Sequence, residues 1–196
     1  MSGGTDYGLT LFDGLGRRKY LSLSERLRFQ KESEKADKET RLFCMVLAFT
    51  GCRISEALEL TPQQLDAGTL CIVFRTLKRR KLIFRAVPVP SRLMRELVGL
   101  SWNMERDAPV WNWCRQTAWR RVKEVMEAAG IQGPQANPKG LRHGFGVANA
   151  EKNIPGAVTQ RWMGHARLET TSIYQQAVGQ EERRFAKRLW HDYARP

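Results

Sequence analysis

Two segments rich in β-branched and aromatic residues interrupt a chain whose other apolar residues recur mostly at helical spacing. Residues 69–75 and 82–87 have the composition of β-strands, and Pro88 and Pro90 end the second segment because proline cannot donate to a sheet ladder. Between the two segments, residues 76–81 are mainly basic and suit an exposed loop. This pattern predicts one antiparallel hairpin and leaves helices and loops for the rest of the chain.

The helical segments carry start and stop signals. Residues 22–25 read Ser-Leu-Ser-Glu and predict a capped helix to about residue 35, while Asp37 caps a core helix that runs to Thr50 and ends at Gly51. Similar signals predict helices over 54–60, 91–100 (capped by Ser91), 115–129, 138–152, 155–163, from 169 onward and over 180–195. The expected fold is therefore mainly α with a small antiparallel β-sheet (α+β).

Charge restricts the partners of the protein. The 196 residues include 33 Lys and Arg against 20 Asp and Glu, which gives a formal net charge of +13. Basic residues cluster over 17–19, 78–85, 115–123 and 183–188, whereas a merely soluble basic protein would spread them evenly. We expect a polyanionic partner, most simply nucleic acid. The length, with 42% hydrophobic residues, favours one domain with tails.

Cysteine and histidine spacing argues against a metal site or a disulfide framework. Cys44, Cys52, Cys71 and Cys114 form no Cys-x-x-Cys pair, and no histidine lies at zinc spacing from them. The first three lie in apolar surroundings and are expected in the core. The longest apolar run, 42–50, is too short to span a membrane, and the N-terminus has no signal-peptide core. We expect a cytoplasmic protein, associated with the nucleoid and not with a membrane.

A histidine and a tyrosine late in the chain are candidates for chemistry. Gly164 supplies a left-handed turn at the end of one predicted helix, His165 follows it, and Tyr174 lies on the next predicted helix. Alone, this pair is weak, because helical tyrosines usually pack and a histidine after glycine is more often a cap. Two upstream segments strengthen it: 50–58 reads Thr-Gly-Cys-Arg-Ile-Ser-Glu-Ala-Leu, and 138–143 reads Pro-Lys-Gly-Leu-Arg-His.

Two arginines, a lysine, a histidine and a tyrosine in this order resemble the tyrosine recombinase (phage integrase) family over residues 37–178. The resemblance implies a catalytic domain that cleaves and rejoins DNA through a covalent 3′-phosphotyrosyl intermediate. The catalytic residues that it implies are Arg53, Lys78, Lys139, Arg142, His165 and Tyr174. Integration, excision, inversion and resolution share this chemistry, and such enzymes are typical of mobile elements.

The implied site needs no metal or other cofactor. Two guanidinium groups, of Arg53 and Arg142, present planar forks of donors to phosphate oxygens and stabilise the charge of the transition state. Tyr174 attacks, and a lysine of the hairpin protonates the leaving 5′ oxygen as general acid. Lys78 is the first choice for this lysine and Lys81 the second. His165 supports the transition state by a hydrogen bond to a phosphate oxygen.

Lys139 departs from the family pattern, which commonly has histidine three positions before the second arginine. A lysine can bind a phosphate oxygen, but it shuttles a proton less easily near neutral pH. Glu56 is expected to orient neighbouring basic groups. His143 is also placed among the supporting residues, although capping and core packing are its simpler roles. Base contacts cannot be assigned, but the DNA-binding candidates are Arg79, Arg80, Arg115, Arg120, Arg121 and Lys123.

The expected organisation is a flexible basic arm over 1–20, a catalytic domain over 21–178 and a C-terminal helix over 179–196. Apolar residues of this helix either pack on their own domain or dock on a neighbouring protomer within a tetramer on DNA. Family members usually carry an N-terminal clamp domain, so this chain is either a catalytic domain cut from a longer one or, as its initiating methionine favours, a short recombinase. Accessory DNA-bending proteins are further expected partners.

Two other functions fit the same residues. A type IB topoisomerase shares the Arg-Lys-Arg-His-Tyr set but rotates one strand instead of exchanging two. A non-catalytic DNA-binding regulator that retained the fold would tolerate Lys139 in place of histidine. Site-specific recombination is the leading hypothesis because every other expected catalytic residue type is present.

Overall fold

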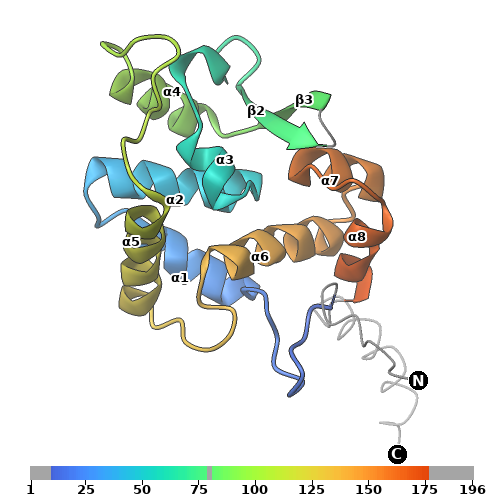
Figure 1. Cartoon of the computed structure of the whole chain (residues 1–196). Coiled ribbons are helices and arrows are strands. Elements are labelled where there is room, and N and C mark those ends of the chain that lie inside the picture. Colours follow the sequence, from blue (N-terminus) through green and yellow to red (C-terminus); the bar gives the residue numbers. More distant parts are fainter. Residues whose placement is uncertain (1–9, 79–80, 177–196) are drawn as a thin grey trace, which may run out of the picture.

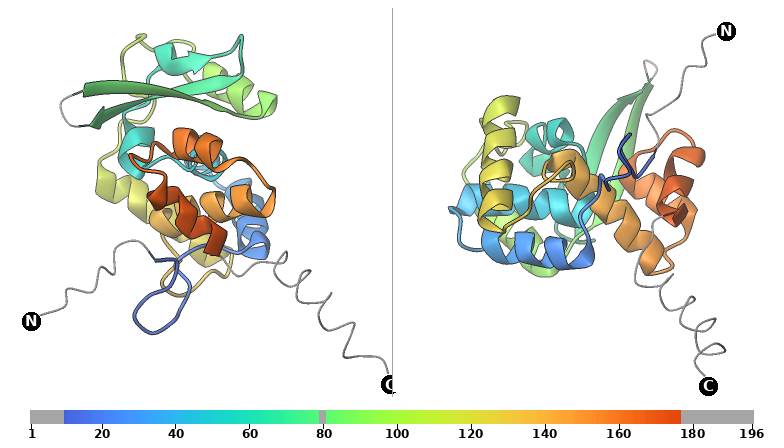
Figure 2. Two further views of the ribbon diagram at one scale, coloured as in Figure 1. Left: turned by 90° about the vertical axis from the view of Figure 1, so that its right-hand side faces the viewer. Right: turned by 90° about the horizontal axis from the view of Figure 1, so that it is seen from below.

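The computed structural model describes residues 10–78 and 81–176. Within these ranges helices dominate, and one small sheet lies against them (Figure 1). The left view of Figure 2 shows the hairpin running along one side of the helical layer. There β2 (Cys71–Lys78) contacts α3 (Ile54–Leu58), and β3 (Lys81–Pro88) contacts α7 (Gly156–Met163). The expected class, mainly α with a small antiparallel sheet, is confirmed.

The first two helices form as their capping signals predict. Helix α1 spans Leu23–Ser33, and Ser22 and Glu25 form a complete capping box at its start. Helix α2 spans Lys38–Thr50, with the Asp37 carboxylate accepting from the Thr40 amide. Gly51 ends α2 with a positive φ of 60°, a conformation that costs glycine least. Most of α2 is buried, because α1 and several helices later in the chain pack against it.

The sheet has three antiparallel strands in the order β1-β2-β3. Strand β2 spans Cys71–Lys78 and β3 spans Lys81–Pro88, and Lys78 pairs with Lys81 at the hairpin end. The predicted loop over 76–81 is therefore largely strand, because the ladder continues through these basic residues. Strand β1, Leu65–Asp66, was missed since two residues carry no periodicity; it follows α3, Ile54–Leu58, and the 3₁₀ turn η2, Pro62–Gln64.

The remaining helices are α4 (Ser91–Leu100), α5 (Arg115–Ala128), α6 (Pro138–Glu151), α7 (Gly156–Met163) and α8 (Glu169–Ser172), followed by the 3₁₀ turn η3 (Ile173–Gln176). One capping prediction is wrong: Pro90, not Ser91, occupies the N-cap of α4, and no side chain caps this helix. Tyr174 lies in η3 instead of a longer helix. The helix predicted over 180–195 lies outside the described residues.

Two apolar clusters form the core. The larger one joins α1 to α5 with the inner face of the sheet, and it includes Trp111, whose ring meets Phe43 edge-on at 5.1 Å. The smaller one joins α6, α7 and η3, and it contains Tyr174. Cys44 and Cys52 are buried as expected, while Cys71 is half-buried and Cys114 exposed. None of the helices that the structure describes is long and apolar enough to cross a membrane.

The N-terminal segment differs from the expected flexible arm over residues 10–20. Leu11 and Tyr20 are buried in the smaller cluster, beside Tyr174. The Arg18 guanidinium donates to both carboxylate oxygens of Glu25, at 2.6 and 2.7 Å. The high glycine content of the segment favoured the prediction of a flexible arm. The segment is instead held by the burial of Leu11 and Tyr20 and by the ion pair between Arg18 and Glu25. Residues 1–9 lie outside the described residues.

Candidate active site

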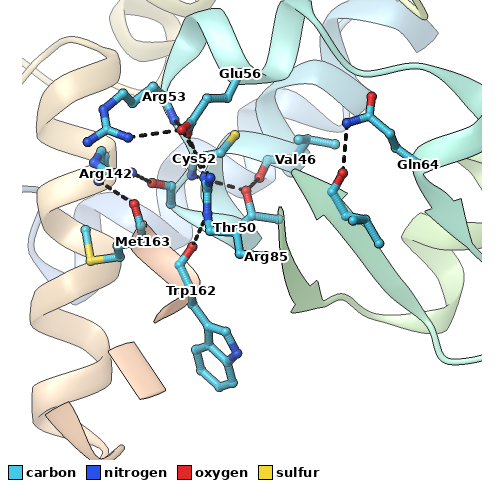
Figure 3. Close-up of polar contacts among 12 residues, drawn as sticks. Val46, Thr50, Cys52, Arg53, Glu56, Gln64, Arg85, Arg142, Trp162 and Met163 are labelled. Carbon is cyan, nitrogen blue, oxygen red and sulfur yellow. Dashed lines mark hydrogen bonds and ion pairs between the residues drawn. The ribbon is translucent and has the colours of Figure 1, made fainter. Parts of the chain in front are cut away.

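Arg53 lies between α2 and α3, directly after the left-handed turn at Gly51. Its amide donates to Glu56 Oε2 at 2.7 Å, and its Nη1 donates to Glu56 Oε1 at 3.0 Å. Figure 3 shows this pair at the start of α3. The Arg53 side chain keeps 46% of its surface exposed, so much of the guanidinium faces outward. Glu56 therefore holds Arg53 in one orientation while leaving it accessible, and its supporting role in catalysis stays a prediction.

Arg85 is a central residue of the site that sequence reasoning missed. Its guanidinium donates to both oxygens of Glu56, with Nη1 to Oε1 at 3.1 Å and Nη2 to Oε2 at 2.7 Å. Its Nε donates to the Trp162 carbonyl at 2.9 Å (Figure 3). The guanidinium also lies over the Phe74 ring, 4.9 Å from its centroid. The available signal was strand alternation, since Arg85 shares a face of β3 with buried Val87.

The Glu56 carboxylate carries its charge in a buried position. Burial by itself would raise its pKa, but hydrogen bonding to Arg85 and the charges of Arg85 and Arg53 lower the pKa below its ordinary value. The carboxylate therefore stays ionised at neutral pH and holds both cations. Glu56 thereby links α3 to Arg85 of the hairpin, and Arg85 in turn links the hairpin to the end of α7.

Arg142 lies on α6 and is only 8% exposed. Its Nη1 donates to the Gly51 carbonyl at 2.5 Å and its Nη2 to the Met163 carbonyl at 2.7 Å. Burial, followed by the charge of Arg53, lowers the pKa of Arg142 to about 10, so the group is still cationic at neutral pH. Two of its five N–H donors are used in these bonds, which leaves donors for an anion. Arg142 thus joins the segment before Arg53 to the segment before His165.

The start of α6 fixes the direction in which the side chains of Lys139 and Arg142 point. The Asn137 side chain caps the helix by accepting from the Gly140 amide at 3.0 Å, and Pro138 occupies the first turn. A methyl group on Gly140 would lie 1.9 Å from the Gln135 carbonyl oxygen, so glycine permits the close approach of the preceding loop. In the same turn Lys139 is exposed.

His165 follows the turn at Gly164, whose φ is 63° as expected for a left-handed cap. Its Nδ1 lies 3.0 Å from the Thr171 hydroxyl, and its ring stacks on Tyr174 with centroids 6.0 Å apart and planes inclined by 19°. Tyr174 is 2% exposed. The predicted histidine and tyrosine therefore do face one another, with the phenol shielded from solvent.

His143 contacts the phenol directly. Its Nδ1 lies 3.2 Å from the Tyr174 hydroxyl. Burial lowers the pKa of His143 to about 4, and the cations Lys139, Arg142 and Lys19 add to this shift. Burial raises the pKa of Tyr174 to about 12, against the opposing charges of Arg142 and Arg53. Instead of acting as a cap, His143 is hydrogen-bonded to the hydroxyl that the resemblance makes the nucleophile.

The structure thus brings together six of the nine residues predicted to be catalytic or supporting. Around the junction of α3, α6, α7 and η3 it places Arg53, Glu56, Arg142, His143, His165 and Tyr174. Lys78 and Lys81 pair at the hairpin end, but where their side chains lie is outside the described part of the structure. Arg79 and Arg80 also lie outside it, so the role of the hairpin basic residues stays a prediction.

The basic residues of α5 differ in how they are held. Arg115 is exposed, and Arg120 lies 3.8 Å from Glu124. Arg121 instead donates to Asp37 at 2.9 Å and to Thr40 at 2.7 Å, and its guanidinium stacks on Trp113 at 4.6 Å. Lys123 lies 3.9 Å from Glu127 and 6.0 Å from the Trp119 ring. Arg121 therefore ties α5 to α2, whereas Arg115 is accessible to a ligand.

Comparison with known proteins agrees with this geometry. The family described as "Phage integrase family" matches residues 19–181. Tyrosine recombinase XerA of Pyrococcus furiosus is 30% identical over 144 residues, which are 68% of this chain and 49% of the relative. Tyrosine recombinase XerH of Helicobacter pylori is 29% identical over 158 residues, 72% of this chain and 42% of the relative. The chain spans about half the length of these curated relatives.

Solved structures share the fold. A crystal structure of XerA recombinase superimposes with a TM-score of 0.72 at 24% identity, covering 90% of this chain and 65% of that one. The catalytic domain of bacteriophage HP1 integrase gives a TM-score of 0.63 at 22% identity, covering 80% of this chain and 86% of that domain. These likenesses confirm the fold expected from the ordered motifs.

Proposed function

Because the chain belongs to the phage integrase family, we propose that it cleaves and rejoins double-stranded DNA in site-specific recombination, with Tyr174 as the nucleophile. The observation that carries the proposal is the placement of one phenol beside two guanidinium groups. The charges of Arg142 and Arg53 both lower the pKa of Tyr174, against the larger effect of burial, which raises it. Such a site attracts a phosphodiester and places it next to an oxygen nucleophile.

Arg53 and Arg142 share the binding of the scissile phosphate in this proposal. Arg53 is accessible and anchored from behind by Glu56, so it can contact non-bridging oxygens without losing its orientation. Arg142 is held by two backbone carbonyls, so its charge is in place before DNA arrives. Preorganised cations of this kind stabilise the pentavalent transition state with little reorganisation.

The bond changes follow from this placement. The Tyr174 oxygen attacks phosphorus, the bond to the 5′ oxygen breaks, and a 3′-phosphotyrosyl bond stores the energy for rejoining. We assign the proton for the leaving oxygen to Lys78 of the hairpin, with Lys81 as the alternative. His165 and Lys139 contribute hydrogen bonds to phosphate oxygens. A 5′ hydroxyl from another strand then reverses the attack, so strand exchange needs no ATP.

The remaining partners belong to the same proposal. Two similar solved structures are XerH bound to its difH substrate and a lambda integrase dimer bound to a core site. We infer double-stranded DNA as the partner of this chain, with a tetramer forming on it, DNA-bending accessory proteins and a place at the nucleoid. The C-terminal residues 179–196 remain candidates for exchange between protomers.

Covalent trapping tests the reaction. The protein is incubated with nicked duplexes made from DNA that flanks its own gene, denatured, and run on a denaturing gel. We expect a protein–DNA band that is absent for Tyr174→Phe. Tyr20→Phe is the matched control, because Tyr20 is a buried tyrosine of the same apolar cluster and should leave the band unchanged. Measurable DNA binding without a band for the wild type would contradict the proposal and favour a non-catalytic regulator.

A further inference from the structure

The proposed reaction leaves one proton without a destination, the phenolic proton of Tyr174. We propose that His143 is a catalytic residue that accepts this proton through its Nδ1 as Tyr174 attacks the phosphate. The inference rests on the proposed function. It is carried by the 3.2 Å contact between His143 Nδ1 and the Tyr174 hydroxyl oxygen, which is a hydrogen-bonding distance.

The surroundings hold this contact in place. His143 directly follows Arg142, whose two bonds to the Gly51 and Met163 carbonyls fix how α6 is rotated. One turn further, Gly146 leaves room for the phenol, because a methyl group there would lie 2.5 Å from the Tyr174 ring. The ring also stacks on His165, with the planes inclined by 19°. The hydroxyl is therefore confined next to His143 before DNA binds.

The two partners are in the starting protonation states of such a transfer. Lys139 and Arg142 on α6, and Lys19 of the N-terminal segment, face His143 and disfavour its cationic form, as does burial. The imidazole is thus neutral at neutral pH and can accept through one nitrogen. Tyr174 keeps its proton until phosphorus approaches, because burial opposes the phenolate. An acceptor with an open lone pair faces a donor that still holds its proton.

Two other residues are less suited to this task. Lys139 carries an ammonium group, which has donors only. His165 presents the face of its ring to Tyr174, and its Nδ1 lies against the Thr171 hydroxyl. A proton acceptor must approach along the hydroxyl bond, not across the ring face. Among the contacts of the Tyr174 hydroxyl, the geometry points to His143.

The step balances. As the bond between the Tyr174 oxygen and phosphorus forms, the phenolic proton moves to His143 Nδ1, and the electron pair of that O–H bond becomes available to phosphorus. The bond from phosphorus to the 5′ oxygen breaks, and the leaving oxygen takes a proton from the lysine assigned as general acid. In rejoining, the imidazolium returns its proton to the departing Tyr174 oxygen.

The test is single-turnover formation of the covalent complex at saturating nicked DNA. His143→Ala removes the acceptor and leaves a space for imidazole. His143→Asn keeps an oxygen that can accept a hydrogen bond but cannot take the proton. We expect both variants to slow cleavage about 100- to 10,000-fold, the range of general-base catalysis, with DNA affinity unchanged. Added imidazole should restore part of the rate in His143→Ala and none in Tyr174→Phe.

Two outcomes would overturn the inference while leaving the proposed function intact. One is wild-type cleavage by His143→Asn, since a hydrogen bond alone would then suffice. The other is a His143→Ala variant that cleaves slowly, is not rescued by imidazole, and has lost thermal stability and DNA affinity in proportion to the loss of rate. Such a result would show that His143 is a packing residue. Absence of the covalent band in the wild type would instead contradict the proposed function.

Discussion

Arg85 of β3 and Glu56 of α3 form a buried two-point ion pair, with Nη2 and Oε2 2.7 Å apart and Nη1 and Oε1 3.1 Å apart. The same carboxylate holds Arg53, and the same guanidinium holds the carbonyl of Trp162. One pair of residues therefore fixes the hairpin, the first arginine and the end of the helix that precedes His165. This arrangement makes the site dependent on a residue that need not touch DNA.

Replacing Arg85 tests this dependence. Arg85→Met removes one partner of the buried Glu56 carboxylate, and removing one partner of a buried pair typically costs about 3–5 kcal/mol. We expect a marked fall in the denaturation midpoint. Glu56→Met/Arg85→Met removes both charges and should recover stability, but it leaves Arg53 unanchored. We expect its covalent complex to form about 10- to 100-fold more slowly, in keeping with small misplacements at active sites.

Arg41→Met is the matched control for this pair. Arg41 forms ion pairs with Glu96 and Glu34, and its side chain is 15% exposed. These contacts join α2 to α4 and to the end of α1, and none of the site residues takes part in them. We expect lower stability with a near-normal rate of covalent complex formation. Recovery of both stability and rate in the Glu56→Met/Arg85→Met variant would show that the pair only stabilises the fold.

Gly146 faces the Tyr174 ring. A methyl group at this position would lie 2.5 Å from ring carbons, and the buried ring cannot yield freely. We expect Gly146→Ala to cost about 1–3 kcal/mol of unfolding free energy and to slow covalent trapping by displacing the phenol. Gly99→Ala is the control, because it is also helical, has nothing within 4 Å of the added methyl, and should be neutral or stabilising by up to about 1 kcal/mol. Equal effects at both positions would rule out a steric role for Gly146.

The stability of the protein should depend on the protonation of His143. Its pKa falls from 6.5 to about 4 on folding, so between these values the unfolded chain binds more protons. The free energy of unfolding therefore falls as pH drops from about 6.5 towards 4, by on the order of 3 kcal/mol in full, and this contribution is constant above that window.

Comparing wild type with His143→Asn isolates this contribution. The cations Lys19, Lys139 and Arg142 and the aromatic neighbours Tyr174 and His165 are common to both proteins. Glu56, whose pKa is lowered, loses its contribution only as pH falls below the ordinary glutamate range, so its effect lies at more acidic pH. Chemical denaturation should show that the free energy of unfolding falls more between pH 7.5 and pH 5 for the wild type than for His143→Asn. Equal falls would contradict the assignment of this pH dependence to His143.

Two arginines of α5, Arg115 and Arg121, should behave differently. Arg121 is bound to Asp37 and Thr40 and stacked on Trp113, so Arg121→Ala should lower stability by about 1–3 kcal/mol. Arg115 is exposed, so Arg115→Ala should leave stability unchanged and, if it contacts a phosphate, reduce the slope of log affinity against log salt by about 1. Titrations at several salt concentrations with thermal melts check both. An unchanged slope for Arg115→Ala would remove it from the interface.

Much of the fold could be predicted from local sequence signals. The capping box at Ser22, the cap at Asp37 and the left-handed glycines 51 and 164 act within one or two turns, so their residues predict the element boundaries directly. The two-residue strand β1 and the packing of Leu11 and Tyr20 were not predictable in this way, because they depend on partners distant in sequence. The choice between Ser91 and Pro90 as cap was decided by backbone conformation.

The sequence by itself determined the chemistry that the chain carries: the ordered arginines, lysines, histidine and tyrosine, the basic charge, and the family. Only the tertiary structure decided which groups cooperate. His143 and Tyr174 are 31 positions apart and Glu56 and Arg85 are 29 apart, so no local pattern joins them. Their contacts exist because two sets of interactions bring the ends of α2, α6 and α7 together. These are the hydrogen bonds from Arg142 to two backbone carbonyls and the buried ion pair between Arg85 and Glu56. Burial there also sets the protonation of His143 and Tyr174, which sequence alone leaves at their ordinary values.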